Sequence, residues 1–68
     1  MSALGNNVKQ ARSQLSLSQE QLAERSGLHR TYVGAVERGE RNPSLTSMLR
    51  LSDGLGVPLS ELVRGIGI

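Results

Sequence analysis

The stretch from Gln19 to Gly39, QEQLAERSGLHRTYVGAVERG, decides the fold of this chain. Ala23 is small at the point where a second helix must come close. Gly27 permits a sharp turn because it has no Cβ to strain a left-handed backbone. Apolar residues at helical spacing then fill the angle between two helices; they are Leu28, Val33 and Val36. A small residue, a turn glycine and an apolar wedge in this order predict two short helices joined by a tight turn.

Apolar residues before this stretch also recur at helical spacing. We expect the inner face of a first helix to carry Leu4, Val8, Ala11 and Leu15. Ser18, followed three residues later by Gln21, is the pattern of a capping box and opens a second helix. Gly27 is expected to end that helix, and a third helix is expected to begin near Arg30 and to end at Gly39.

Two further helices are expected downstream. Ser44 follows an Asn-Pro turn and is expected to cap a fourth helix. The apolar set of this helix comprises Leu45, Met48, Leu49, Leu51 and Leu55. Ser52 and Gly54 lower its helix propensity, so we expect looser packing there or a covering partner. A short fifth helix is expected over residues 59–64, with a loose tail over residues 65–68.

Length and composition bound the function. The 68 residues, 37% of them apolar and 21% charged, predict a single all-α domain over residues 1–68. There is no cysteine and a single histidine, so we expect no disulfide, no metal site and no cofactor. Without a membrane-spanning run or a secretory signal, a cytoplasmic location is expected. Without a nucleophile or a cluster of carboxylates beside the lone histidine, an enzyme is not expected.

The charge balance alone does not decide the function. The net charge is +2, and seven of the eight cationic residues are arginine. A guanidinium group can grip phosphate or guanine at two points, which an ammonium group cannot. This small excess permits binding to nucleic acid, but a solvated surface would have the same balance.

The chain resembles the lambda-repressor/Cro-type helix-turn-helix family, also called the xenobiotic-response-element family. The resemblance extends from Leu4 to Leu62 and rests on landmarks at Arg12, Ser18-Gln19, Leu22-Ala23, Gly27-Leu28, Val33, 36–39, 41–45 and 55–59. The segment 30–34, followed by Glu37-Arg38, is also similar to the controller proteins of restriction–modification operons. The resemblance implies a compact five-helix, lambda-repressor-like domain whose second motif helix enters the major groove of double-stranded DNA.

In this family, residues at the start of the third helix read base edges; here they are His29, Arg30, Thr31 and Ala35. We expect Arg30 to contact guanine O6 and N7, a contact worth about 1–3 kcal/mol of discrimination. Thr31 can place its methyl group against thymine or its hydroxyl on a phosphate. His29 stands where the family has Ser, Thr or Asp as a cap, so a weaker cap is expected. A solvated loop histidine is the alternative to a DNA contact.

Tyr32 and Gly34 each allow two interpretations. Tyr32 is expected to face away from Val33 and Val36 and to bond a phosphate, with packing on a neighbouring helix as the alternative. Gly34 costs about 1 kcal/mol relative to alanine inside a helix. Close approach to the DNA backbone would explain this glycine, and a tolerated defect is the alternative.

Phosphate contacts are expected on both sides of the recognition helix. The resemblance implies that Gln19 binds phosphate at the start of the second helix, where backbone N–H groups favour anions. A capping or solvated role is the alternative for this residue. Further phosphate contacts are expected from Arg38, Arg41, Asn42 and Ser44, while Glu40 offsets part of the local positive field. The family also implies a partly buried structural ion pair between Arg12 and Glu37.

These observations predict a sequence-specific transcriptional regulator, a repressor or controller, that binds double-stranded DNA as a homodimer on a roughly palindromic operator. No small-molecule effector is expected. The dimer surface is expected to use apolar residues of the fifth helix and tail: Leu59, Leu62, Val63, Ile66 and Ile68. The alternative is that the first three of these close the monomer core. A protein-interaction module of the same fold, such as an antitoxin or a coactivator-like adaptor, is the alternative function.

Overall fold

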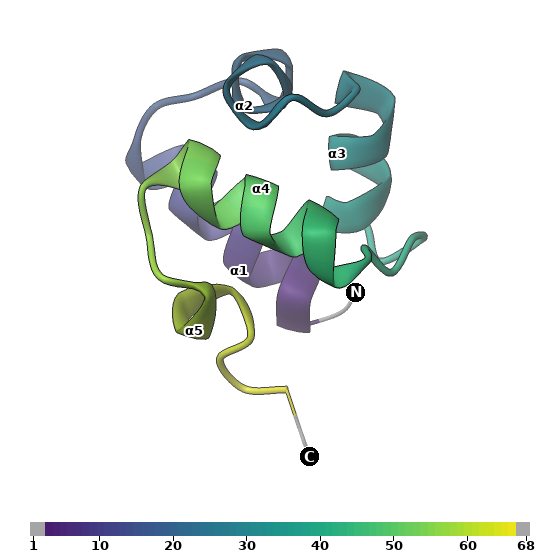
Figure 1. Ribbon diagram of the computed structural model, residues 1–68, viewed down its shortest axis with the longest axis vertical. Helices are drawn as coiled ribbons and strands as arrows, with labels where there is room; N and C mark the ends of the chain where they lie inside the picture. Colours follow the sequence, from purple (N-terminus) through teal and green to yellow (C-terminus); the bar gives the residue numbers. More distant parts are fainter. Residues whose placement is uncertain (1–2, 67–68) are drawn as a thin grey trace.

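The computed structural model describes residues 3–66, which form five helices and no strand (Figure 1). The helices are α1 (Ala3–Gln14), α2 (Gln19–Ser26), α3 (Arg30–Glu37), α4 (Leu45–Leu55) and α5 (Leu59–Leu62). The predicted all-α, five-helix fold is therefore confirmed. In Figure 1, α2 lies at the top and is seen nearly end-on, α3 forms one side, and α4 passes in front of α1 with α5 below them. Gly67 and Ile68, which belong to the predicted loose tail, lie outside the described residues.

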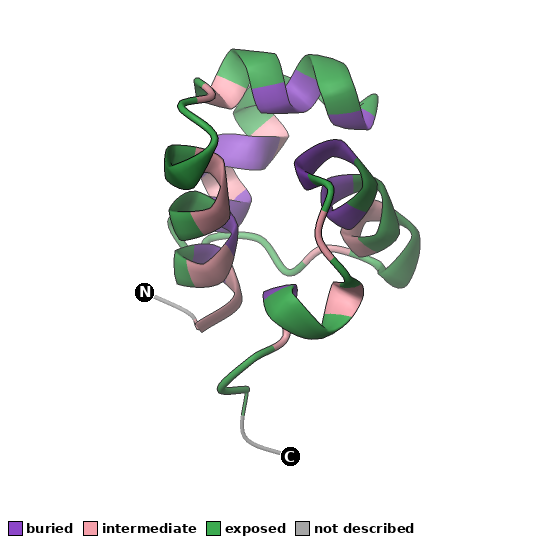
Figure 2. Ribbon diagram, turned by 90° about the vertical axis from the view of Figure 1, so that its left-hand side faces the viewer, coloured by how far each residue is buried: buried purple, intermediate pink, exposed green. Residues whose placement is uncertain are grey.

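The core lies where the inner faces of the helices meet, as the purple segments of Figure 2 show. The buried apolar residues within 3–66 are Val8, Leu22, Ala23, Val33, Val36, Leu51, Leu55 and Leu62. Full burial of a Val or Leu side chain contributes about 1.5–3 kcal/mol relative to exposure. Val33 and Val36 of α3 and Leu22 of α2 share this core, so apolar packing sets the angle between the two motif helices.

Three leucines expected in the core are exposed instead. Helix α1 ends at Gln14, and Leu15 lies in the turn that follows it. In α4, Leu45 is 60% exposed and Leu49 is 49% exposed. Residues two positions apart on a helix differ by about 200° around its axis. Burial of Leu51 therefore turns Leu49 towards solvent.

Helices α2 and α4 approach closely at Gly54, contrary to the looser packing that was expected there. A Cβ built on Gly54 would lie 3.1 Å from the Ser26 Cβ and 3.2 Å from the Ser26 backbone nitrogen. Ser26 and Ser52 are also buried, and their hydroxyls donate to the carbonyl oxygens of Leu22 (2.7 Å) and Leu49 (2.9 Å) respectively. These small residues permit tight helix packing with every hydroxyl satisfied.

The predicted helix starts are confirmed by their caps. The Ser18 hydroxyl accepts from the Gln21 backbone N–H at 3.0 Å, and the Ser18 N–H donates to Gln21 Oε1 at 2.8 Å. The Ser44 hydroxyl accepts from the Ser47 N–H at 3.1 Å. At the end of α2, Gly27 adopts φ +70°, which a residue with a Cβ rarely tolerates. Both ends of α2 and the start of α4 are therefore defined by local sequence.

Helix α5 is shorter than predicted and is fastened to α1. It ends at Leu62, and the side-chain amide of Asn7 donates to the carbonyl oxygens of Leu62 (3.0 Å) and Arg64 (2.7 Å). The Ile66 N–H donates to the Val63 carbonyl at 3.2 Å and closes a turn over residues 63–66. Leu62 is fully buried in the monomer, which contradicts its expected place on a dimer surface.

Candidate nucleic-acid interface

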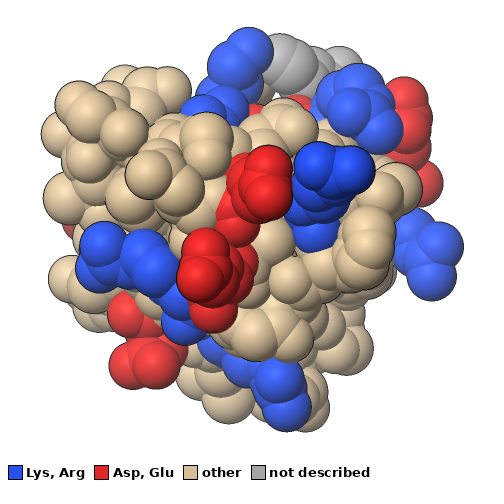
Figure 3. Space-filling view, turned by 90° about the horizontal axis from the view of Figure 1, so that it is seen from above, with Lys and Arg blue, Asp and Glu red and all other residues tan. Residues whose placement is uncertain are grey.

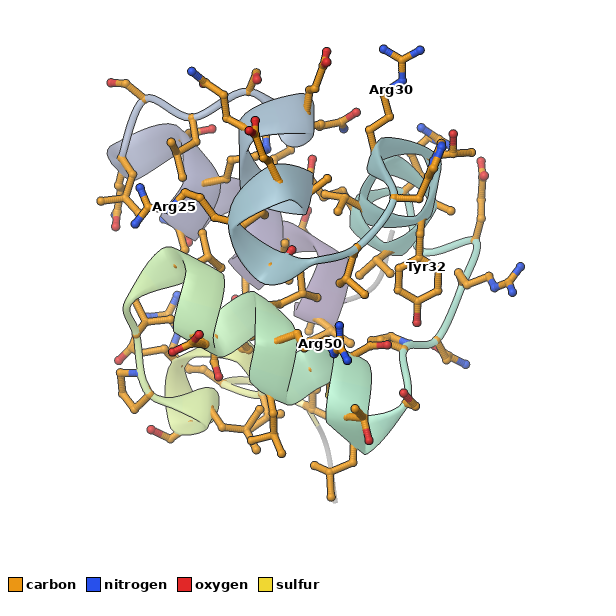
Figure 4. The ribbon with its side chains drawn as sticks, turned by 45° about the horizontal axis from the view of Figure 1, so that its top comes forward. Arg25, Arg30, Tyr32 and Arg50 are labelled. Atoms are coloured by element: carbon orange, nitrogen blue, oxygen red, sulfur yellow. The ribbon has the colours of Figure 1, made fainter. Side chains whose placement is uncertain are left out.

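Helices α2 and α3 are joined by a turn of three residues and lie against each other at a steep angle (Figure 4). Gly27 and Leu28 both donate their backbone N–H groups to the Ala23 carbonyl, which closes α2 and directs the chain into α3. Val33 and Val36 face the core, whereas Arg30 points away from the molecule in Figure 4. The outer face of α3 is thus free of packing contacts along its first turn.

The carboxylate of Glu37 joins three segments at the end of α3. Arg12 donates to it from Nε at 2.7 Å and from Nη2 at 3.0 Å, and Gln19 donates from Nε2 at 3.0 Å. Arg12 Nη1 donates in addition to the Leu17 carbonyl at 2.7 Å. The hydrogen bond to Glu37 raises the pKa of Arg12 above its ordinary value, by more than burial lowers it. The ion pair expected between Arg12 and Glu37 is present.

Glu37 also orients the Gln19 side chain. A carboxylate only accepts hydrogen bonds, so the NH₂ group of the amide must face it. One of the two amide N–H bonds points to Glu37, and the other has no hydrogen-bond partner among the described residues. Sequence reasoning assigned Gln19 to a phosphate and missed this second role, because Glu37 lies eighteen residues further along the chain.

His29 caps α3 with a side-chain hydrogen bond, at the position where a weaker cap was expected. Its backbone is extended (φ −81°, ψ 142°), and its Nδ1 accepts from the Thr31 N–H at 3.1 Å. This bond uses the Nδ1 lone pair, so the ring proton of the neutral side chain lies on Nε2. The imidazole therefore replaces the hydroxyl or carboxylate of a typical cap. The predicted base-reading residues Arg30 and Thr31 follow directly and are exposed.

Gly34 provides space for two side chains. It is buried on α3, and a Cβ built there would lie 3.0 Å from Arg38 Nη1 and 3.2 Å from Gln19 Oε1. The glycine thus makes room for the Arg38 and Gln19 side chains. Neither of the two predicted explanations, close approach of the DNA backbone and a tolerated defect, included this role. Ala35, the neighbouring candidate, is half-buried.

Tyr32 packs against the core, contrary to the expected orientation. Tyr32 and Val36 are four residues apart and so share one face of α3. The ring is half-buried beside the core cluster, and the Arg41 guanidinium lies 5.6 Å from its centroid. In Figure 4 the ring extends from α3 towards the side of the molecule that carries Arg50. Arg41 is therefore held beside α3 by a cation–π contact.

Acidic side chains accompany the cations of this region. Arg30 Nη1 lies 3.5 Å from Glu20 Oε2, and Arg38 is paired with Glu40 through two hydrogen bonds. Figure 3, which views the molecule from the side of α2, shows basic and acidic side chains next to one another rather than one continuous positive patch. Asn42 and Ser44, the remaining candidates, are exposed between α3 and α4. The local charge is therefore mixed.

Comparison with known proteins assigns this chain to a protein family. The family model described as Helix-turn-helix matches residues 8–62. This chain belongs to the helix-turn-helix family. Control protein C.SmaI of Serratia marcescens is 48% identical over 65 residues, which cover 96% of this chain and 77% of that protein. Control protein C.BamHI of Bacillus amyloliquefaciens is 45% identical over 60 residues, which cover 87% of this chain and 74% of that protein.

A solved structure agrees with this assignment. The restriction–modification controller protein C.AhdI from Aeromonas hydrophila is 47% identical, with a TM-score of 0.86 over 88% of this chain and 91% of that chain. The helix-turn-helix domain described here is therefore of the lambda-repressor/Cro type and is similar to restriction–modification controller proteins. Its role is that of a DNA-binding transcriptional regulator.

Two exposed arginines of this helix-turn-helix domain were not singled out from the sequence. Arg25 lies in the last turn of α2, and Arg50 extends from α4 towards the motif turn, with its Nη1 3.5 Å from the Gly27 carbonyl (Figure 4). The approach of Arg50 depends on the contact between α2 and α4, for which the sequence holds no local signal. Within residues 3–66, no cluster of metal-binding side chains is present, and none of the helices has the length and apolar character of a membrane span.

Proposed function

We propose that this helix-turn-helix regulator binds operator DNA by placing α3 in the major groove, without catalysis and without a small-molecule effector. The observation that carries the proposal is the split between the two faces of α3. Val33 and Val36 are buried, while Arg30 and Thr31 are exposed at its start, beside the His29 cap. The major groove admits one α-helix, and the first turn of a recognition helix contacts base edges.

In this proposal, the other candidates hold the DNA backbone. Gln19 keeps one amide N–H for a phosphate, and Arg38 and Arg41 lie at and just after the end of α3. Asn42 and Ser44 extend the same surface towards α4. Contacts to phosphate position the protein but carry no direct sequence information. Tyr32 contributes through Arg41, whose guanidinium it holds at its ring face.

We further propose that the active form is a homodimer on a roughly palindromic site. The described domain measures 30 × 22 × 21 Å and holds one recognition helix. Half-sites on one face of B-DNA are spaced by about 34 Å, so two copies are needed to read both. Apolar side chains available for the contact are Leu45, Leu49 and Ile66, with half-buried Leu59 and Val63. Leu62 is not part of the proposed dimer contact, because it is fully buried within the monomer.

Selection of binding sites from random duplex DNA, combined with a salt titration, tests the DNA-binding proposal. The expected product is a roughly palindromic sequence whose half-sites lie one helical turn apart. Affinity is expected to fall steeply with salt, with a log–log slope of about −0.9 for each phosphate neutralised. A salt-independent affinity, or selection without any enriched sequence, would contradict the proposal.

Sedimentation at several protein concentrations tests the dimer separately. Leu49→Lys is expected to shift the equilibrium towards monomer. Leu15→Lys is the matched control, because Leu15 is also an exposed leucine but lies after α1 and outside the proposed surface. A wild-type protein that stays monomeric at all concentrations would contradict the dimer, and equal effects of the two variants would contradict its surface.

A further inference from the structure

Glu40 occupies the Nε–Nη2 edge of the Arg38 guanidinium. Arg38 Nε donates to Glu40 Oε2 at 3.0 Å, and Arg38 Nη2 donates to Glu40 Oε1 at 3.2 Å. Two parallel N–H···O bonds from one guanidinium edge are also the geometry in which arginine binds phosphate. The carboxylate therefore stands at Arg38 as an intramolecular counterpart of a phosphate.

The backbone after α3 holds the two side chains in this position. Gly39 adopts φ +76°, its N–H donates to the Val36 carbonyl, and the Glu40 N–H donates to the Ala35 carbonyl at 2.9 Å. This pair of bonds is the Schellman arrangement that closes a helix with a left-handed glycine. The turn fixes the position of the Glu40 Cα relative to Arg38. Formation of the ion pair therefore costs little additional backbone entropy.

The opposite side of the Arg38 guanidinium lies on the proposed DNA face. Nη1 is located above Gly34, in the space that it shares with the Gln19 amide. The side chains of Arg38 and Glu40 are 55% and 60% exposed, so duplex DNA can reach both. Hydrogen bonds from Arg38 lower the pKa of the Glu40 carboxyl below its ordinary value.

We propose that Glu40 competes with DNA phosphate for Arg38 and thereby lowers the affinity of the domain for duplex DNA of any sequence. The inference rests on the proposed function. A phosphate that binds Arg38 must displace Glu40 or share the guanidinium with it. Affinity for non-operator DNA comes from phosphate contacts, so a carboxylate at this position restrains non-specific binding. Base contacts from the start of α3 are then needed for tight binding.

A double-mutant cycle on non-operator DNA tests this competition. The probe is a short fluorescein-labelled duplex of mixed sequence, followed by anisotropy at low salt. Glu40→Gln is expected to raise the affinity about two- to fivefold, the range of an exposed ion pair. In the Arg38→Gln background the same substitution is expected to change nothing, because the contested cation is absent. An equal rise in both backgrounds would overturn the proposal, since Glu40 would then act only through its general charge.

Glu61→Gln provides the matched control. Glu61 is an exposed carboxylate paired with Arg64 at 3.2 Å, outside the proposed DNA face. The Glu61→Gln substitution is expected to leave the affinity for the duplex unchanged. An increase equal to that of Glu40→Gln would overturn the proposal. Unchanged or weaker binding by the Glu40→Gln variant would also overturn the proposal. Urea unfolding verifies that each variant is folded. Wild-type protein that fails to bind the duplex would contradict the proposed function itself, which separates the two failures.

Discussion

The Arg12 guanidinium and the Glu37 carboxylate form a two-pronged ion pair that joins α1 to the end of α3. Its N–O distances are 2.7 and 3.0 Å, and the Glu37 side chain is only 2% exposed. Gln19 adds a third donor from the start of α2. Both oxygens of this buried carboxylate are therefore satisfied, which is the condition under which a buried charge is tolerated.

Removal of the carboxylate should strongly destabilise the domain. Glu37→Ala is expected to lower the free energy of unfolding by about 3–5 kcal/mol, because the largely buried Arg12 loses its counter-charge. Urea denaturation measures this change. Glu61→Ala, which breaks an exposed pair with Arg64, is expected to cost no more than about 1 kcal/mol. Equal losses in the two variants would show that burial does not matter here.

The His29 cap gives a second prediction. His29→Ala removes the acceptor for the Thr31 N–H and is expected to cost about 1 kcal/mol of stability. His29→Asn keeps a side-chain acceptor at the same position and is expected to stay close to the wild type. Midpoints of urea unfolding for the three proteins distinguish these results. An alanine variant as stable as wild type would mean that the imidazole bond contributes nothing.

Two helical glycines should respond in opposite ways to an added methyl group. A Cβ on Gly5 would lie 2.5 Å from the Glu37 carbonyl oxygen, so Gly5→Ala must push α1 away from α3. We expect a loss of about 1–3 kcal/mol, as in other overpacked sites.

At Gly34, by contrast, the Cβ would meet only the ends of the Arg38 and Gln19 side chains, which can move. Gly34→Ala is therefore expected to keep or raise stability, since alanine favours helix by about 1 kcal/mol. Thermal unfolding of both variants checks the contrast. A Gly34→Ala variant as unstable as Gly5→Ala would contradict it.

The Arg38–Glu40 pair predicts a pH effect with a definite sign. The pKa of the Glu40 carboxyl is lowered in the folded protein, so the pair stabilises the fold above the unfolded pKa. That contribution is lost as the pH falls through the folded pKa. A carbon-detected NMR titration should find the Glu40 pKa below its ordinary value in wild type and restored in Arg38→Gln. An unchanged pKa in the variant would exclude the pair as its cause.

The arginines of the DNA face should divide into two roles. Arg30→Ala is expected to relax sequence choice, with a loss of about 1–3 kcal/mol of discrimination at one base pair. Arg41→Ala is expected to weaken binding to all sequences alike and to reduce the salt slope by about 0.9. Competition assays with operator and non-operator duplexes measure both. Identical behaviour of the two variants would contradict the division of roles.

Local patterns in the sequence predicted much of this molecule. The capping box of Ser18 and Gln21, the turn at Gly27 and the inward face of Val33 and Val36 each depend on residues within one or two helical turns. Such features are decided by backbone stereochemistry and helical spacing before distant segments meet. The boundaries of α2 and α3, and hence the location of the candidate interface, followed from them.

Apart from the Arg12–Glu37 ion pair, which the family resemblance implied, features that depend on contact between distant segments were not predicted. The sequence does not show that α4 turns Leu49 outward, that Gly54 admits Ser26, or that Asn7 binds the end of α5. The role of Gly34 likewise depends on the Gln19 side chain fifteen positions earlier in the chain. Each of these requires the relative placement of two helices, which local propensity leaves open.

The carboxylate of Glu37 has a consequence for how this regulator fits its target. Because one group holds the start of α2, the end of α3 and the last turn of α1, the proposed phosphate-binding and base-reading elements are fastened to one another. The domain then has little freedom to adjust the angle between them. Any mismatch between these elements and an operator must be absorbed by bending or twisting of the duplex, at a cost that depends on its base steps. Flexible steps between the contacted bases would then favour binding although no side chain touches them.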